Sequence, residues 1–174
     1  MTDKVQLTWQ DVEYMLHDIV RDMHNDGWKP DLVVGIDRGG LPISVMLSHY
    51  LAVQHENVKV SLRDATDSEC ESNLWLPELA LEGKKILIVD DINDTGATQA
   101  WIKKDWTDSV SGVNPNFVLD YWHDSIRWAS LVDNEASKET SDYTGMSINK
   151  LENDVWIDFP WESWWTRSTY ESGI

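Results

Sequence analysis

The feature that most constrains the fold is an unbroken apolar run at 86–89, Ile-Leu-Ile-Val, which leads directly into two aspartates. A strand that is apolar at every position must be buried on both faces, which is typical of parallel sheets. Other apolar or alternating runs predict strands, and residues repeating at helical spacing predict helices. The strands are expected at 32–36, 57–62, 85–90, 116–122 and 155–157, and the helices from Thr8 to about 26, at 41–51 and at 97–108. This alternation predicts an α/β fold with a central parallel sheet flanked by helices.

The length and composition agree with one compact unit. The chain has 174 residues, of which 41% are hydrophobic, so a single domain over 1–174 can bury a sizeable core. No apolar run approaches the roughly 18 residues of a membrane span, and the first residues do not resemble a signal peptide. Cys70 is the only cysteine, which excludes an internal disulfide. A cytoplasmic location without membrane contact is therefore expected.

The charge balance limits the kinds of molecule that the protein is expected to bind. Acidic residues number 31 and basic residues 14, which gives a net charge of −17. Nucleic-acid binding depends on lysine and arginine side chains that neutralise phosphates, so we expect no nucleic-acid partner. A small polyanionic substrate would meet the same repulsion. It would have to be held locally by a metal ion and by oriented backbone N–H groups.

The segment that follows the apolar run carries the chemistry. Asp90 and Asp91 end the strand, and a short turn with Asp94 and Gly96 leads into the next helix. Helix amino termini bind phosphate, and glycine allows close approach of the backbone. The adjacent carboxylates suit sugar hydroxyls or a divalent metal. The segment therefore predicts a sugar-phosphate site at the carboxyl edge of the sheet. A helix cap alone would explain one or two of these residues.

This segment resembles the binding motif for phosphoribosyl pyrophosphate (PRPP) of the type I phosphoribosyltransferases. That motif is an apolar strand, two acidic residues, two variable residues and then D-T-G-x-T, and the match is complete. Segment 34–41 resembles the family's pyrophosphate loop, and segment 154–162 resembles the hood of its hypoxanthine/guanine/xanthine branch. The resemblance implies a small carboxyl-terminal hood at about 123–174 and a mobile loop at about 61–83.

The resemblance also implies a role for each matching residue. Those expected to bind PRPP are Asp90 and Asp91 at the ribose, Asp94, Thr95, Gly96, Ala97 and Thr98 at the 5′-phosphate, and Asp37, Arg38 and Gly39 at the pyrophosphate. Asp94 is also the expected general acid/base. Those expected at the base are Trp156, Ile157 and His123. Mg²⁺ is the expected cofactor, with Asp91 and Glu162 as candidate ligands. The peptide before Arg38 is expected to be cis.

The expected reaction is transfer of the phosphoribosyl group from PRPP to a nucleobase in nucleotide salvage. The hood favours a 6-oxopurine. However, the branch has a lysine where a strand at 116–122 would place His123, and a surface role for that histidine is equally open. The alternatives are a nucleotide-sensing regulator of the same fold, an enzyme for another acceptor such as adenine or a pyrimidine, and a protein that has lost catalysis. The family usually forms homodimers or homotetramers.

Overall fold

The computed structural model describes residues 3–60, 62, 73–112, 115–116 and 121–167. Its centre is a five-stranded sheet with strand order β3-β2-β4-β5-β6, in which all neighbours are parallel. The strands are β2 (Leu32–Asp37), β3 (Gln54–Lys59), β4 (Ile86–Asn93), β5 (Ile126–Asn134) and β6 (Tyr143–Ile148). The helices are α1 (Trp9–Asn25), α2 (Leu41–Leu51), α3 (Trp75–Leu81), α4 (Ala97–Ser111) and α5 (Tyr121–Asp124). The parallel α/β architecture predicted from the sequence is confirmed.

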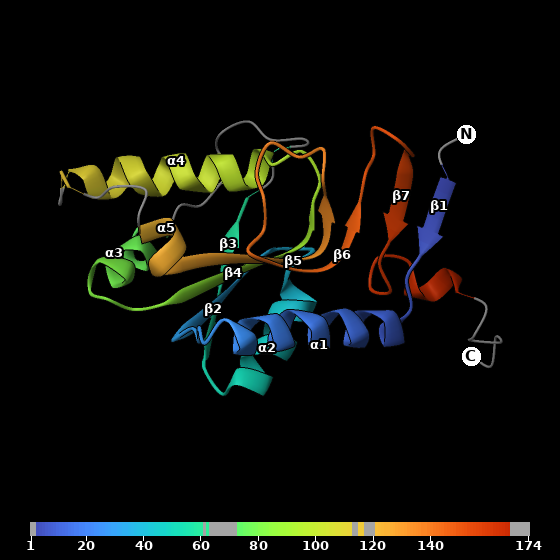
Figure 1. Cartoon of the computed structure of the whole chain (residues 1–174), viewed down its shortest axis with the longest axis horizontal. Helices are drawn as coiled ribbons and strands as arrows, with labels where there is room; N and C mark the ends of the chain where they lie inside the picture. The colour runs from blue at the N-terminus through green and yellow to red at the C-terminus, as the bar shows by residue number, and fades with distance from the viewer. Residues whose placement is uncertain (1–2, 61, 63–72, 113–114, 117–120, 168–174) are drawn as a thin grey trace.

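The helices cover both faces of this sheet, with α1 and α2 on one side and α3, α4 and α5 on the other (Figure 1). The central strand β4 explains the arrangement because successive side chains point to opposite faces. Leu87 and Val89 belong to the core with α1 and α2, whereas Ile86 and Ile88 belong to the core with α3 and α4. Each of the four is fully buried, as the unbroken apolar run predicted.

Helix α1 begins where the sequence predicted it. Thr8 accepts a hydrogen bond from the backbone N of Asp11 at 3.1 Å, and the Asp11 carboxylate accepts one from the backbone N of Thr8 at 2.7 Å. This reciprocal pair is a capping box. The apolar face of the helix packs against the sheet. Its buried residues are Val12, Met15, Leu16, Ile19 and Met23.

The sequence-based boundaries fail in several places. β3 begins at Gln54, three residues before the predicted strand, and part of the predicted loop at 61–83 forms helix α3. Residues 61 and 63–72 of that loop lie outside the described residues. The prediction of a strand at 116–122 is wrong at its end, because Tyr121 and Trp122 belong to α5. Trp122 is buried, and its ring stacks on that of Trp106 with a centroid distance of 5.8 Å. A short apolar run of this kind does not distinguish a helix from a strand.

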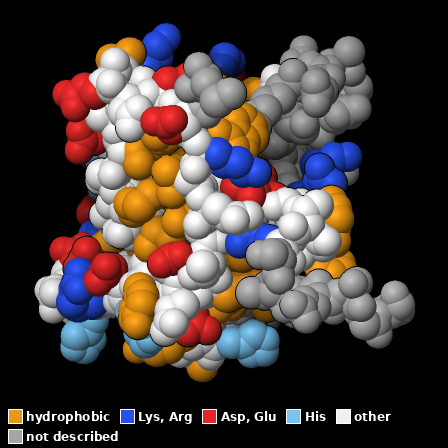
Figure 2. Space-filling view, turned by 90° about the vertical axis from the view of Figure 1, so that its right-hand side faces the viewer, with side chains coloured by type: hydrophobic (Ala, Val, Ile, Leu, Met, Phe, Trp, Pro, Cys, Tyr) orange, Lys and Arg blue, Asp and Glu red, His pale blue; other side chains and the backbone are white. Residues whose placement is uncertain are grey.

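A second, two-stranded sheet lies beyond β6. It pairs β1 (Asp3–Gln6) in parallel with β7 (Val155–Asp158) (Figure 1). Because β5 and β6 belong to the main sheet, the separate hood consists of β1, β7 and residues 159–167. Hydrophobic side chains form a band on this side of the molecule (Figure 2). A cavity of about 280 Å³ lies between β6 and the hood, and its apolar lining is Val5, Met146, Ile148, Val155 and Ile157.

Within the described ranges, none of the helices is both long and apolar enough to cross a membrane.

Candidate active site

The carboxyl edge of β4 places the acidic residues of the sugar-phosphate motif. The strand runs to Asn93, three residues beyond its predicted end, so Asp90 and Asp91 lie within it. The Asp90 carboxylate accepts a hydrogen bond from the backbone N of Asp91 at 3.0 Å, and the Asp91 carboxylate accepts one from the backbone N of Ile92 at 2.8 Å. Both side chains are half-buried. The two carboxylates are thus oriented by backbone donors at the end of a rigid strand.

We call the turn after β4, residues 94–98, the phosphate cradle, after the ligand predicted for it. Gly96 has φ +83°, a left-handed conformation that glycine adopts readily, and helix α4 begins at Ala97. A Cβ atom on Gly96 would lie 2.8 Å from the backbone N of Glu139. Gly96, the residue before the helix, has no side chain to cap α4, and the backbone N of Ala97 donates a hydrogen bond to the Thr95 hydroxyl at 3.3 Å. A helix amino terminus of this kind can bind an anion, and the assignment of 94–98 to the 5′-phosphate stays a prediction.

The loop after β2 closes directly onto this motif. The Asp37–Arg38 peptide is cis, as the resemblance implied. A Cβ atom on Gly39 would lie 2.1 Å from an Asp91 carboxylate oxygen, so the backbone at Gly39 packs against that carboxylate. Gly40 is equally close to β4, since its Cβ would lie 2.3 Å from the Val89 carbonyl oxygen. The structure therefore brings the two predicted PRPP-binding loops together at one edge of the sheet.

Asp94 has two neighbours that the sequence did not reveal. The Lys150 ammonium lies 2.9 Å from the Asp94 carboxylate, and both side chains are mostly buried. Asn134, at the end of β5, donates a hydrogen bond to the Asp94 carbonyl oxygen at 2.8 Å. Lys150 lies in the turn between β6 and β7, 56 residues from Asp94. No pattern in that turn indicates chemistry, and only the fold brings the lysine to the site.

The connection from β5 to β6 holds the phosphate cradle in place through hydrogen bonds. The Asn93 amide donates to the Asp133 carboxylate at 2.8 Å and to the Glu139 carbonyl oxygen at 2.6 Å. The Ser137 hydroxyl donates to the Asn93 amide oxygen at 3.0 Å. The backbone N of Lys138 donates to the Thr95 carbonyl oxygen at 3.3 Å. These bonds fix the turn before any ligand binds.

His123 does not reach this edge. It lies in the short helix α5, just before β5 begins, whereas Asp94 follows the carboxyl end of the parallel strand β4. The length of β5 separates the two edges by roughly 25 Å. The His123 side chain is 82% exposed and lies 3.6 Å from the Asp142 carboxylate. The prediction that His123 meets the base is therefore corrected. The prediction assumed that the strand next to β4 lies at 116–122. That strand is β5, and its last residues, at the edge of the sheet that carries Asp94, are Asp133 and Asn134.

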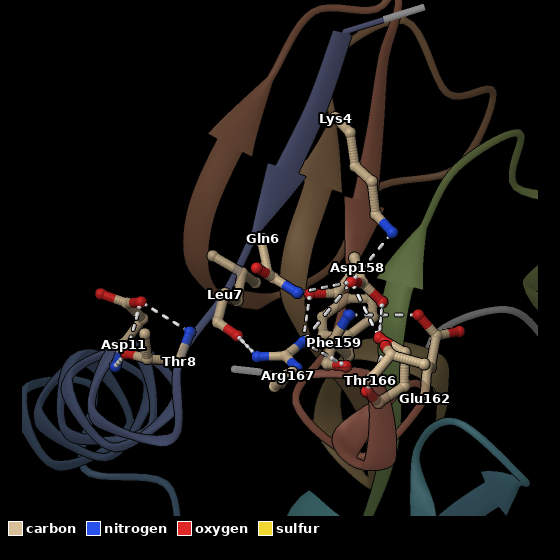
Figure 3. A network of polar contacts seen from close by, with 11 residues as sticks. Lys4, Gln6, Leu7, Thr8, Asp11, Asp158, Phe159, Glu162, Thr166 and Arg167 are labelled. Carbon is tan, nitrogen blue, oxygen red and sulfur yellow. Dashed lines mark hydrogen bonds and ion pairs between the residues drawn. The ribbon is translucent and has the colours of Figure 1, made fainter. Parts of the chain in front are cut away.

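The hood holds the other residues predicted to meet the base. Trp156 on β7 is 49% exposed, whereas Ile157 is buried. The Glu162 carboxylate accepts a hydrogen bond from the backbone N of Phe159 at 3.1 Å and closes the turn after β7 (Figure 3). The hydrogen bond that the structure shows for the Glu162 carboxylate is therefore with another residue of the hood. The predicted role of Glu162 as a metal ligand stays a prediction.

A buried carboxylate holds the hood together. The Asp158 carboxylate accepts hydrogen bonds from Ser163 at 2.9 Å and Gln6 at 3.1 Å, and pairs with Lys4 at 3.1 Å (Figure 3). Burial acts to raise the pKa of Asp158, but the bonds from Lys4, Ser163 and Gln6 outweigh it and leave the pKa below its usual value. Arg167 donates to the carbonyl oxygens of Leu7 and Phe159 beside this carboxylate.

Replacing Asp158 with asparagine is expected to lower the free energy of unfolding by about 1–3 kcal/mol at neutral pH, because buried donors lose a charged acceptor. Since folding lowers the pKa of Asp158, the stabilisation is present above the unfolded value of 3.8 and is lost as the pH falls through the folded value. Urea unfolding at pH 7 and pH 3 measures both effects. A gap between wild type and variant that is equally large at pH 3 would contradict the ionic role.

The residues present fit a magnesium ion. Among the described residues, no group of three His, Cys, Asp or Glu side chains could hold a metal by itself. Magnesium typically takes one or two carboxylates and completes its shell with substrate phosphates and water. The Asp90 and Asp91 carboxylates, of which that of Asp91 lies against Gly39, supply hard oxygen donors of that kind.

Comparison with known proteins agrees with this geometry. The family model of the phosphoribosyl transferase domain matches residues 5–164. A purine phosphoribosyltransferase from Pyrococcus horikoshii has 27% identity and a TM-score of 0.64, over 93% of this chain and 96% of that chain. Xanthine-guanine-hypoxanthine phosphoribosyltransferase of Helicobacter pylori has 18% identity and a TM-score of 0.64, over 94% and 95%. A hypothetical protein of Neisseria gonorrhoeae with bound ppGpp has 21% identity and a TM-score of 0.66, over 94% and 91%.

The chain therefore belongs to the phosphoribosyltransferase domain family. Its fold is that of the type I phosphoribosyltransferases, as the sequence motif indicated.

Proposed function

We propose that this protein is an enzyme that transfers the 5-phosphoribosyl group from PRPP to a 6-oxopurine base and releases pyrophosphate. The complete PRPP motif, the adjacent Gly39 loop and the likeness to a purine phosphoribosyltransferase support this function. In the transfer, the bond between ribose C1 and the pyrophosphate oxygen breaks, and the oxygen keeps the electron pair. A base nitrogen forms the new bond to C1, and the base loses a proton.

Each element of the site has a part in this reaction. The first turn of α4 and the Thr95 hydroxyl bind the 5′-phosphate through N–H and O–H donors. Asp90 and Asp91 accept hydrogen bonds from the ribose hydroxyls. Arg38 and the backbone at Gly39 bind the pyrophosphate. Mg²⁺, when bound, neutralises charge on the leaving pyrophosphate. Asp94 accepts the proton that the base releases.

The observation that carries the choice of base is the pair formed by Lys150 and Asp94, whose charged atoms lie 2.9 Å apart. An ammonium next to a carboxylate presents a donor beside an acceptor. A 6-oxopurine has a matching edge, with its exocyclic oxygen next to a ring nitrogen that can carry a proton. Adenine would direct an amino N–H at the ammonium instead. Lys150 therefore supplies, from the β6–β7 turn, a hydrogen-bond donor to the base in place of His123.

A panel of bases tests this function. The protein would be incubated with Mg²⁺, PRPP and, separately, hypoxanthine, guanine, xanthine, adenine, uracil or orotate, and nucleotide would be measured by chromatography. We expect product with 6-oxopurines and little with adenine. Lys150→Met should lower kcat/KM for the oxopurine by about 10–100-fold, because a charge-assisted hydrogen bond is lost. The matched control is Lys104→Met, since Lys104 is 78% exposed and pairs with Asp108 on the surface of α4.

Two outcomes would contradict the proposal. Product with adenine at an equal rate would assign the site to another acceptor. No product with any base would favour a nucleotide-sensing role; the hypothetical protein of Neisseria gonorrhoeae, which has a similar fold, holds bound ppGpp. Calorimetry with guanosine nucleotides would then test binding without turnover.

A further inference from the structure

Asn134 contacts both members of the Asp94–Lys150 pair. Its amide nitrogen donates to the Asp94 carbonyl oxygen at 2.8 Å and lies 3.4 Å from the Asp94 carboxylate. Its amide oxygen accepts hydrogen bonds from the backbone N of Lys150 at 3.1 Å and of Ala136 at 3.2 Å. Asn134 is 6% exposed. A single buried amide thus joins the phosphate cradle to the turn that carries Lys150.

The position of Asn134 follows from the end of the strand pairing. The register between β4 and β5 ends with Asn93 opposite Asp133, so the backbone of Asp94 has no strand partner beyond that point. Buried backbone groups require hydrogen-bond partners, and the Asn134 side chain supplies one. Asn134 is also the last residue of β5, which makes its own backbone part of the rigid sheet.

Asn134 differs from the neighbouring side chains in joining the two members of the pair directly. Asn93 binds Asp133, Glu139 and Ser137 and so holds the start of the turn. Among the side chains that the structure describes, only that of Asn134 forms hydrogen bonds to both Asp94 and Lys150. Lys150 in turn reaches Asp94 through its ammonium at 2.9 Å. Asn134 is therefore the side chain that links the turn carrying Lys150 to the backbone of Asp94.

We propose that Asn134 is a positioning residue that sets the spacing of the Asp94 carboxylate and the Lys150 ammonium, and thereby the preference for a base with an exocyclic oxygen. This inference rests on the proposed function. An acceptor and a donor fixed side by side bind two adjacent groups of the base at once. When either shifts, only one contact remains, and the oxopurine loses its advantage over adenine. Asn134 acts through its neighbours and is not itself required to touch the substrate.

The isosteric variant Asn134→Asp tests this role. It keeps the shape and the oxygen that accepts from Lys150 and Ala136, but it replaces the donor facing Asp94 with a carboxylate oxygen. We expect kcat with the oxopurine to fall about 100-fold, since small misplacements of reacting groups have effects of that size. We also expect the ratio of oxopurine to adenine activity to fall about tenfold, and KM for PRPP to change less than threefold. Asn134→Ala should behave similarly.

A destabilised control separates positioning from general loss of stability. Arg127→Met removes contacts with Asp26 and Tyr143 at the amino edge of the sheet. It should lower the melting temperature and leave the base preference unchanged. If Asn134→Asp keeps the wild-type kcat and base preference, or changes them only as much as Arg127→Met does, the proposal is overturned.

A second measurement does not depend on activity. Limited acetylation followed by peptide mass spectrometry reports how accessible the Lys150 ammonium is. We expect Lys150 to react about three to ten times faster in Asn134→Ala than in wild type, because the ion pair with Asp94 is weakened. Lys104 provides the internal reference. Unchanged reactivity would overturn the positioning role even if the enzyme is active. If wild type forms no nucleotide, the proposed function fails, and the acetylation rate alone decides whether Asn134 positions Lys150.

Discussion

Nucleotide formation is expected to fall by about 10²–10⁴-fold when Asp94 is replaced with asparagine, which is the range typical of a lost general acid/base. Asparagine has the same shape as aspartate, so the turn between β4 and α4 keeps its length and conformation. It cannot accept the proton of the base, and it no longer pairs as a carboxylate with Lys150. Steady-state rates with saturating PRPP and an oxopurine measure the effect.

The matched control for Asp94→Asn is Asp108→Asn. Asp108 is 63% exposed and pairs with Lys104 on the surface of α4. Exposed pairs contribute little to stability, so this variant should retain wild-type activity. If Asp94→Asn retained more than a tenth of the wild-type rate while PRPP still bound, Asp94 would not be the general acid/base.

The second large effect is expected from the addition of one methyl group at Gly39. In Gly39→Ala the new Cβ would lie 2.1 Å from an Asp91 carboxylate oxygen, which is far inside van der Waals contact. Either the loop after β2 or the Asp91 side chain must move. Both are predicted to bind PRPP, so we expect kcat/KM for PRPP to fall by about 100-fold. Titration with PRPP in the presence of Mg²⁺ measures the loss of binding directly.

Gly112→Ala is the control for this substitution. A Cβ on Gly112 would meet nothing within 4 Å, and its φ of −69° suits any residue. The variant should keep wild-type activity, and the lower flexibility of the unfolded chain should leave its stability equal or slightly higher. Equal PRPP affinity in the Gly39 and Gly112 variants would show that the Gly39 loop does not contribute to the PRPP site.

Local patterns predicted much of this fold and failed where long-range contacts decide. Residues 86–89 showed a strand buried on both faces because burial is visible in a run of apolar side chains. β6 gave no such signal. It carries Gly145, where an added Cβ atom would lie 2.3 Å from the Met15 side chain. Only a glycine fits at this position because helix α1 packs closely against the strand. The strand that was expected at 116–122 failed because Trp122 is buried by a helix contact with Trp106.

The candidate site likewise contains residues that the sequence predicted and residues that only the structure revealed. The PRPP motif is continuous in sequence, and its residues lie together in the structure because one strand and one turn carry them. Lys150 and Asn134 meet Asp94 only through the pairing of separate strands, and neither stands in a recognisable pattern. His123 was assigned to the base because its position was counted from a strand that begins later than expected, at Ile126.

The pairing of β1 with β7 has a consequence for how the protein acquires its shape. Gln6 and Asp158 meet across 152 positions of the chain. Contacts so distant in sequence require closure of a very long loop and form slowly unless the intervening chain has already become compact. During synthesis the first strand must therefore wait, unpaired, until nearly all of the described chain has left the ribosome. The part predicted to receive the base is expected to be assembled last, and a chain halted before β7 would present an exposed strand edge that is prone to aggregation.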